Sequence, residues 1–326
     1  MKKIIIMMVL VMMTCTLTSC QLFDVMNMVQ MEEDVTKKPA KENAGGGFKY
    51  QFDNEELVNN EFAYITAKES LKRDNVFELV INVENRLNAD MSLSMGLITE
   101  EWCSVNGYMM EPYLMVDTIK QDGEITQSVM FSMDDFNLYG ITELSDIQMR
   151  FLCIDNNDLL NFYESDLIKL TTPVADTYDY EKDTYLETLK NSKAMKSMGY
   201  ELIELEENVY EENGIKIVSQ AVIDKKYGGQ YIYLEFQNDT DDIVRGEIST
   251  RFLNGLELEN DGDRTVVLNP GTRSVKWFSV AVLSGYEDEE VLSVKEIEEF
   301  EYDFEFQNYE DREMLTSGSA KLAVED

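Results

Sequence analysis

The feature that most constrains the fold is a pattern of alternating apolar residues that occurs twice in the chain. Apolar residues on alternate positions lie on one face of a β-strand. The two copies are separated by a constant offset (238 − 85 = 153) and each ends in an asparagine; they are Leu79, Ile81, Val83 and Asn85, and Ile232, Leu234, Phe236 and Asn238. The repeat predicts two β-structures of the same kind in succession.

Turn signals repeat as well. Asn106-Gly107 and Asn254-Gly255 are separated by 254 − 106 = 148 residues, so one loop is shorter in the second copy. Asn-Gly accommodates positive φ and predicts a tight hairpin in each copy, whereas a binding role for these residues is the weaker interpretation. Further aligned pairs are Gly123 with Gly271, Ile147 with Ile297, and Leu170 with Leu322.

These patterns divide the chain after residue 47. Residues 48–172 and 201–326 each contain short alternating strands separated by Gly, Asn and Asp turns, which predicts an antiparallel β-sandwich in each. Residues 173–200 lie between them. Within this segment Thr184–Glu187 has capping-box spacing and Gly199 is a stop signal, so we expect a linker with a short helix.

The N-terminus has the features of an export signal. Lys2 and Lys3 precede an apolar run, and the run ends in Leu17-Thr18-Ser19-Cys20, which resembles the lipobox of bacterial lipoproteins. We therefore expect a signal peptide over residues 1–19 and lipidation at Cys20; the alternative is an ordinary cleavage site beside an incidental cysteine. Residues 20–47 have the composition of a flexible tether, although the Met-rich part could form a short interfacial helix.

The sequence also resembles a family, the uncharacterised immunoglobulin-like lipoproteins of low-GC Gram-positive bacteria. The resemblance rests on turn motifs: Asn213-Gly214-Ile215, Asn238-Asp239-Thr240-Asp241, Leu253-Asn254-Gly255, Asn269-Pro270-Gly271, Val105-Asn106-Gly107 and Asp122-Gly123. Glu61 departs from the family, which tends to have glycine there. The resemblance implies an all-β protein of two tandem immunoglobulin-like sandwiches, anchored outside the cell membrane, without known catalytic residues.

Composition excludes several kinds of chemistry. The 326 residues include 64 acidic and 28 basic side chains, a net charge of −36, so nucleic acid is not an expected partner. There is no histidine, which excludes Ser-His-Asp and Cys-His catalysis and nearly every common zinc site. Paired carboxylates and oxygen-ligated cations remain possible.

Three groups of residues are candidates for a site. Acidic turns offer weak calcium ligands, but solvated turns without a cofactor are the expectation; these residues are Asp155, Asp158, Asp261 and Asp263. Aromatic residues could form a carbohydrate or peptide platform, although core positions are the expectation; these residues are Trp102, Tyr108, Tyr113, Phe131, Trp277 and Phe278. Cys103 and Cys153 could form a disulfide, but we expect two buried free thiols.

The expected function is a non-enzymatic binding or spacer module, held at the membrane by its lipid and contacting an unknown protein or glycan. The outward strand faces and the loops beside Asn106 and Asn254 are the expected contact surfaces. The alternatives are a carboxylate-dependent glycan hydrolase and an accessory component of an envelope complex. A cavity of several hundred Å³, lined by convergent carboxylates of which one has a strongly shifted pKa, would favour the hydrolase.

Overall fold

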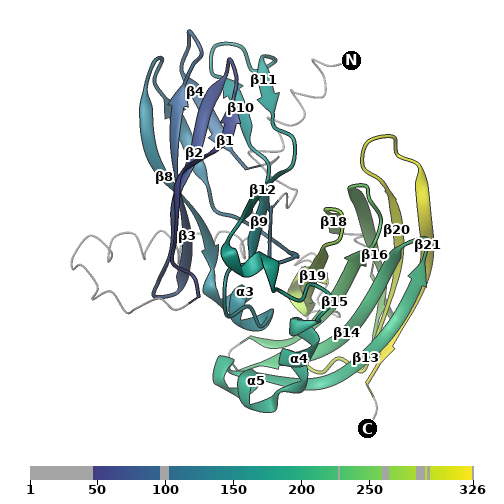
Figure 1. Ribbon diagram of the computed structural model, residues 1–326. Coiled ribbons are helices and arrows are strands. Elements are labelled where there is room, and N and C mark those ends of the chain that lie inside the picture. Colours follow the sequence, from purple (N-terminus) through teal and green to yellow (C-terminus); the bar gives the residue numbers. More distant parts are fainter. Residues whose placement is uncertain are drawn as a thin grey trace. The chain divides into compact units, whose positions relative to one another are not determined.

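The computed structural model describes residues 47–95, 103–226, 228–258, 264–283, 291 and 294–324. This part of the chain is all-β, with several antiparallel sheets and a few short helices (Figure 1). By contacts the chain divides into Met1–Gly45 and Gly46–Asp326, so all described residues belong to the second unit. Cys20 lies outside the described residues. Among those described, no helix has the length and apolar character needed to cross a membrane.

The expected first repeat contains twelve strands and a short helix in its described part. The strands are β1 (Tyr50–Asn59), β2 (Ala63–Arg73), β3 (Val76–Asn85), β4 (Met91–Ser94), β5 (Cys103–Val105), β6 (Tyr108–Met110), β7 (Met115–Ile119), β8 (Glu124–Ser132), β9 (Asp146–Met149), β10 (Leu152–Asp155), β11 (Phe162–Glu164) and β12 (Ile168–Thr171). Helix α3 (Met133–Leu138) follows β8 directly.

The segment between the repeats and the second repeat contain the remaining elements. A 3-10 turn (Pro173–Asp176) precedes helices α4 (Thr184–Lys190) and α5 (Ser192–Met198). The strands that follow are β13 (Tyr200–Glu212), β14 (Ile215–Lys225), β15 (Gly229–Asn238), β16 (Val244–Leu253), β17 (Leu256–Glu257), β18 (Arg264–Leu268), β19 (Arg273–Ser279), β20 (Glu299–Asn308) and β21 (Met314–Ala323). Helix α6 (Val280–Leu283) follows β19 directly.

Four strands of each repeat follow the same order. The first repeat has a sheet β1-β2-β3-β8 and the second has β13-β14-β15-β19, each built from two hairpins in succession and a strand that leads into a short helix. The remaining strands form different sheets in the two repeats: β11-β10-β4-β7 has four strands, and β17-β16-β20-β21, with β18 beside β16, has five. Strands β12-β9-β5-β6 of the first repeat continue the sheet of β19, β15, β14 and β13, so that sheet has eight strands. The internal repeat in the sequence therefore corresponds to a repeated order of these four strands.

Two asparagines make the same hydrogen bonds in the two repeats. The amide nitrogen of Asn85 donates to the carbonyls of Ala89 and Ile119 at 2.8 and 2.9 Å. Asn238 donates to the carbonyls of Asp242 and Leu268 at 2.8 and 3.2 Å. Each side-chain oxygen accepts from the backbone N–H two residues later. Because a buried side-chain amide needs such partners, each asparagine ties the end of one strand to two loops.

The two Asn-Gly hairpins confirm the expected turns. Asn106 and Asn254 have φ of 52° and 51°, and the following glycines are also positive. The Asn106 oxygen accepts from the N–H of Ser145, and the Asn254 oxygen accepts from the N–H of Glu298, both at 2.8 Å. This match has an offset of 298 − 145 = 153.

That offset corrects one sequence alignment. It makes Phe300 the counterpart of Ile147, in place of Ile297. The strand register agrees, because Ile147 pairs with Leu170 and Phe300 pairs with Leu322. The sequence alignment paired Ile147 with Ile297 because an isoleucine occupies the position at the shorter offset of 297 − 147 = 150. The loop in the second repeat is longer than the loop before Ile147, and this difference shifts the true counterpart to Phe300.

The turn at Glu61, where the family tends to have glycine, is built differently from the one at Asn213-Gly214. Asn213-Gly214 forms a two-residue turn with both φ positive, whereas the β1–β2 connection has four residues between the paired Asn59 and Tyr64. The Asn60 side chain accepts from the N–H groups of Phe62 and Ala63 at 2.8 and 3.0 Å. An Asx turn thus replaces the positive-φ turn where glycine is missing.

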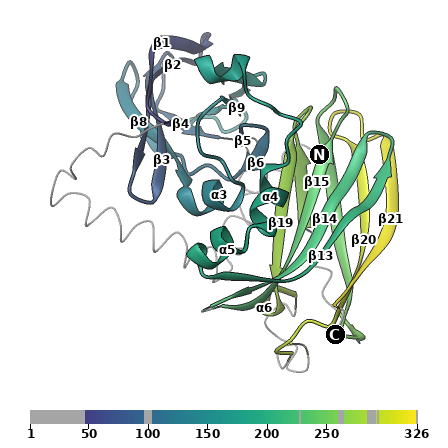
Figure 2. The ribbon, with the colours of Figure 1, turned by 60° about the horizontal axis from the view of Figure 1, so that its bottom comes forward.

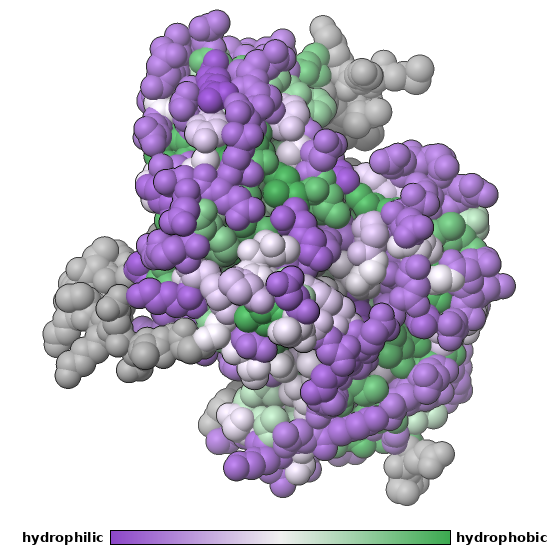
Figure 3. All heavy atoms as spheres, in the orientation of Figure 1, coloured by the Kyte–Doolittle hydropathy of each residue, from purple (hydrophilic) through white to green (hydrophobic). Residues whose placement is uncertain are grey.

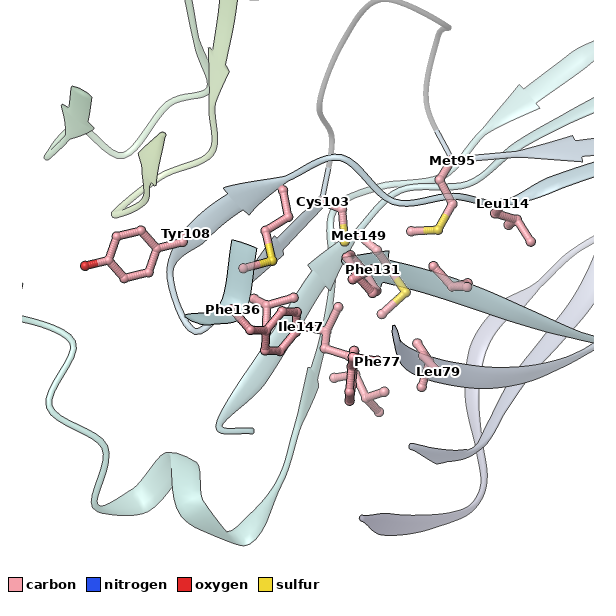
Figure 4. Close-up of a cluster of buried hydrophobic side chains, with 14 of the residues drawn as sticks. Phe77, Leu79, Met95, Cys103, Tyr108, Leu114, Phe131, Phe136, Ile147 and Met149 are labelled. Carbon is pink, nitrogen blue, oxygen red and sulfur yellow. The ribbon is translucent and has the colours of Figure 1, made fainter. Parts of the chain in front are cut away.

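The first repeat has a core of large aromatic side chains. Phe77 packs against Phe131 and Phe136, with ring centroids 5.8 and 5.1 Å apart, and Leu79 and Met149 lie in the same cluster (Figure 4). Phe278, Phe300, Tyr302 and Phe306 are in the core of the second repeat. The alternating pattern in the sequence thus identified strand faces that are buried.

The repeats are joined more closely than a linker alone would join them. Strand β6 pairs with β19 in parallel, and the N–H of Arg273 donates to the carbonyl of Gly107 at 2.7 Å. Tyr185, Leu189 and Met195 of α4 and α5 belong to one buried cluster with Tyr233 and Val275 of the second repeat. Figure 2 shows these helices beside β19 and β13. The outer face of sheet β13-β14-β15-β19 is therefore partly covered by protein.

Helix α4 begins one residue earlier than the capping-box pattern suggested. Asp183 is the N-cap of α4 and accepts from the N–H of Leu186 at 2.8 Å, so Thr184 is the first helical residue instead of the cap. Thr184 donates to the carbonyl of Tyr139 at 2.6 Å, which holds its hydroxyl away from the helix end. Gly199 ends α5 with φ of 78°, as expected of a C-cap glycine.

Candidate functional site

A cavity of about 390 Å³ lies between the α3–β9 turn and the start of α4. This volume is within the range of small-molecule sites. Its wall is polar, with Thr142, Thr177, Thr184 and Thr188 contributing hydroxyl-bearing side chains. Gly140 belongs to the wall because its backbone approaches α4: a Cβ there would lie 2.7 Å from the carbonyl oxygen of Thr184.

Three carboxylates line this cavity: Glu143, Asp179 and Glu187. All three are exposed to solvent. Lys182 also lines the cavity, and its ammonium pairs with Glu187 at 2.8 Å. The cavity is therefore a hydrated, net acidic site, and its acids lack the burial by which glycoside hydrolases raise the pKa of a general acid.

A separate group of charges is buried at the junction of the repeats. The Arg273 guanidinium lies between Asp183 on the α4 cap and Glu235 on β15, 3.3 Å from the Glu235 carboxyl. Ser219 donates to the other Glu235 oxygen at 2.9 Å. Tyr108 of β6 reaches the same place, because the N–H of Tyr185 donates to its hydroxyl at 3.1 Å. The group thus connects both repeats and α4.

Burial and charge act in opposite directions on Glu235. Burial raises its pKa most, the Asp183 carboxylate raises it further, and Arg273 and the Ser219 hydroxyl lower it, leaving a pKa of about 8. The side chain is 0% exposed. Glu235 does not line the cavity described above. The cavity and the carboxyl group whose pKa is strongly raised are therefore in different places.

In the acidic turn of the β10–β11 hairpin, the carboxylates accept hydrogen bonds from backbone N–H groups of the same turn. Asp155 accepts from the N–H of Asn157 at 2.8 Å, and Asp158 accepts from the N–H of Leu160 at 3.1 Å. The bond from the N–H of Asn157, followed by one from the Asn161 side chain, holds the pKa of Asp155 below its ordinary value. Asp261 and Asp263 lie outside the described residues. In the described part, no group of three or more acidic or cysteine side chains is arranged to hold a metal.

The aromatic candidates divide into core and surface. Tyr108, Phe131 and Phe278 are buried and Tyr113 is half-buried, while Trp102 lies outside the described residues. Trp277 differs, because 41% of it is exposed. The expectation of core packing is therefore wrong for Trp277. The alternating strand pattern placed it on the face opposite Phe278, and that face is only partly covered.

The expected contact loop beside Asn106 is covered by the chain itself. Asn106 is buried, and Tyr180 from the segment before α4 hydrogen-bonds Asp146 at 3.0 Å next to this turn. A Cβ on Gly107 would lie 3.8 Å from the Tyr180 ring. The Asn106 loop is therefore not a free surface, which corrects that part of the sequence-based expectation. The reason is that residues 177–180 fold back over it.

Cys103 and Cys153 are both buried free thiols, as expected. Burial raises the pKa of Cys153 to about 12, and it raises the pKa of Cys103 further, with Asp146 contributing. A thiolate is the reactive form of cysteine. Neither residue is therefore suited to nucleophilic chemistry.

Comparisons with known proteins add little to this geometry. No protein-family model matches the chain, and no curated protein matches it. A conserved domain protein from Bacillus anthracis is 8% identical with a TM-score of 0.24, over 89% of this chain and 95% of that one. The YadV chaperone is 12% identical with a TM-score of 0.21, over 75% and 92%. Bacteroides uniformis beta-glucuronidase 2 is 8% identical with a TM-score of 0.20, over 85% and 28%. Likenesses at these TM-scores carry no argument about function.

Proposed function

We propose that this chain is a lipid-anchored protein on the outer side of the cell membrane that works by contact and not by catalysis. Its mature part consists, in this proposal, of two tandem immunoglobulin-like sandwiches joined by the α4–α5 segment. The lipobox-like Leu17-Thr18-Ser19-Cys20 supports the anchor. The matching order of β1-β2-β3-β8 and β13-β14-β15-β19 and the matching bonds of Asn85 and Asn238 support the two sandwiches.

The observation that carries the non-enzymatic part is the separation of Glu235 from the cavity. A carboxylate-dependent hydrolase needs two acids facing one substrate site, one of them with a raised pKa. The carboxyl with the strongly raised pKa is sealed between Arg273 and Ser219, and the carboxylates at the cavity are open to water. Glu235 thus has the environment of a group that stabilises a junction between segments.

Catalysis and contact can be separated with purified protein. We expect no release of reducing ends from cell-wall or plant glycans, measured at pH 5 to 8. Release that is lost in Glu143→Gln or Asp179→Asn, and kept in the matched surface variant Glu247→Gln, would establish the hydrolase. Glu247 is a suitable control because it makes an ordinary surface ion pair with Arg245 at 3.0 Å.

The location is tested on intact cells. Protease added outside should remove the protein from wild-type cells, and Cys20→Ala should shift the protein from the cell fraction to the medium. A protein that is protected from protease until the cells are lysed would contradict an extracytoplasmic position.

A further inference from the structure

The outer face of sheet β13-β14-β15-β19 carries a cluster of aromatic rings around one ammonium group. The Lys225 Nζ lies 4.2 Å from the ring centroid of Tyr231, 5.2 Å from that of Trp277 and 5.3 Å from that of Tyr200. Trp277 and Tyr231 meet edge to face, with centroids 5.6 Å apart and an interplanar angle of 64°. These four residues form the aromatic platform. Contacts of this kind hold the indole in one orientation before any ligand arrives.

The exposure of the platform is uneven. Trp277 is exposed, while Tyr200, Tyr231 and Lys225 are half-buried. Tyr233, the cross-strand partner of Trp277, is buried. The indole is therefore a large apolar surface that faces water, and its neighbours on the sheet are half-buried or buried. Figure 3 shows how hydrophilic the visible surface of the protein is in general, as expected from its net charge of −36.

The fold does not require aromatic residues at these positions, because the first repeat lacks them. The strand registers make Ser128 the counterpart of Trp277 and Glu78 the counterpart of Tyr231. There the Ser128 hydroxyl donates to the Glu78 carboxylate at 3.1 Å, on an equivalent sheet. A polar pair thus satisfies the same strand positions, so the aromatic platform is a feature of the second repeat alone.

The charges around the platform indicate what it can bind. Lys225 supplies hydrogen-bond donors. Two carboxylates, opposite in charge to Lys225, act on Tyr200: burial raises the pKa of Tyr200 most, and Asp134 and Asp135 raise it further. An anionic ligand would be repelled by these acids and by the chain as a whole. A sugar ring has an apolar face for the indole, and its hydroxyls both accept from an ammonium and donate to carboxylates. We propose that the aromatic platform binds an uncharged glycan, with one sugar ring stacked on Trp277 and its edge toward Lys225.

This inference deepens the proposed contact function and rests on it for its biological meaning. The chain provides its own reporter, since it has two tryptophans, Trp102 and Trp277. In a Trp102→Phe background, tryptophan fluorescence comes from Trp277 alone. Titration with neutral N-acetylglucosamine oligomers and gluco-oligomers should give a saturable change, and titration with oligogalacturonate should give none.

Variants then assign the contact, with affinity measured by calorimetry. Trp277→Ala should weaken binding about tenfold or more, and Lys225→Met should weaken it severalfold while keeping the apolar stem. Ser128→Ala on the equivalent face of the first repeat should leave the affinity unchanged. Circular dichroism of each variant checks the fold, which the exposed position of Trp277 leaves undisturbed.

Each outcome is decisive for the platform. Absence of saturable binding by every sugar overturns the proposal, and binding of the acidic oligomer alone overturns the uncharged class. Binding that survives Trp277→Ala and Lys225→Met places the glycan elsewhere. These measurements use protein in solution, so they are independent of the Cys20 anchor and of the reducing-end assay. Failure of glycan binding at the platform therefore does not refute the proposed function, which is tested separately by the cell-fraction and reducing-end assays.

Discussion

The buried carboxyl of Glu235 makes the stability of the protein depend on pH. The pKa is 4.5 in an unfolded chain and about 8 in the folded protein. Because the folded state holds the proton more tightly, this group favours folding at low pH. Its contribution is lost as the pH rises from the unfolded value through the folded one.

The magnitude follows from the two pKa values. Between pH 5 and pH 8 the folded state loses about half of its bound proton, while the unfolded state is already largely ionised at pH 5. Integration over this interval gives a loss of about 3 to 4 kcal/mol in the free energy of unfolding. No discount for solvent applies, because Glu235 is fully buried.

The variant that isolates this effect is Glu235→Gln. Glutamine has the shape of the protonated acid and does not titrate, so its stability should not fall with this group's ionisation. The difference in free energy of unfolding between variant and wild type should therefore move by about 3 to 4 kcal/mol in favour of the variant from pH 5 to pH 8. Acidic residues distant from Glu235 contribute equally to both proteins and cancel in the difference.

Urea unfolding followed by circular dichroism, at half-unit pH steps, measures this difference. Glu247→Gln is the matched control, because Glu247 is partly exposed and pairs with Arg245 on the surface. A constant difference for Glu235→Gln would refute the reasoning. It would mean that Arg273, 3.3 Å away, outweighs burial and keeps Glu235 ionised throughout.

Four further predictions follow from the same structure. Labelling cells with an acyl-chain analogue should mark the wild type and not Cys20→Ala, and equal labelling of both would rule out lipidation there. Asn85→Ala and Asn238→Ala should each destabilise by about 2–4 kcal/mol in urea, because each leaves loop carbonyls without a donor, whereas Asn82→Ala on an exposed side-chain contact should cost much less. The thiols of Cys103 and Cys153 should not react with a thiol reagent in native protein and should react fully in urea; rapid native reaction would show that they are accessible. Gly246→Ala should lower stability by about 1–3 kcal/mol, because a Cβ there would lie 2.3 Å from the Phe306 ring, and an unchanged urea midpoint would show that the ring moves freely.

The strand pattern could be predicted because it is local. Leu79, Ile81 and Val83 alternate, as do Ile232, Leu234 and Phe236, and a strand with one buried face imposes that period. The Asn-Gly turns could be predicted for a similar reason, since positive φ at Asn106 and Asn254 is a property of the residues in the turn. The exported, lipid-anchored address remains a prediction from the first twenty residues.

The junction and the aromatic platform could not be predicted in this way. Alternation places Glu235, Tyr233 and Trp277 on the face opposite the core, and from sequence that face looks exposed to water. The tertiary structure divides it: Glu235 and Tyr233 are sealed by α4 and by the neighbouring repeat, and Trp277 is left open. Sequence period determines which side of a strand a residue occupies. Whether that side meets water depends on segments distant along the chain, such as Tyr108 and Asp183, and only folding brings those segments there.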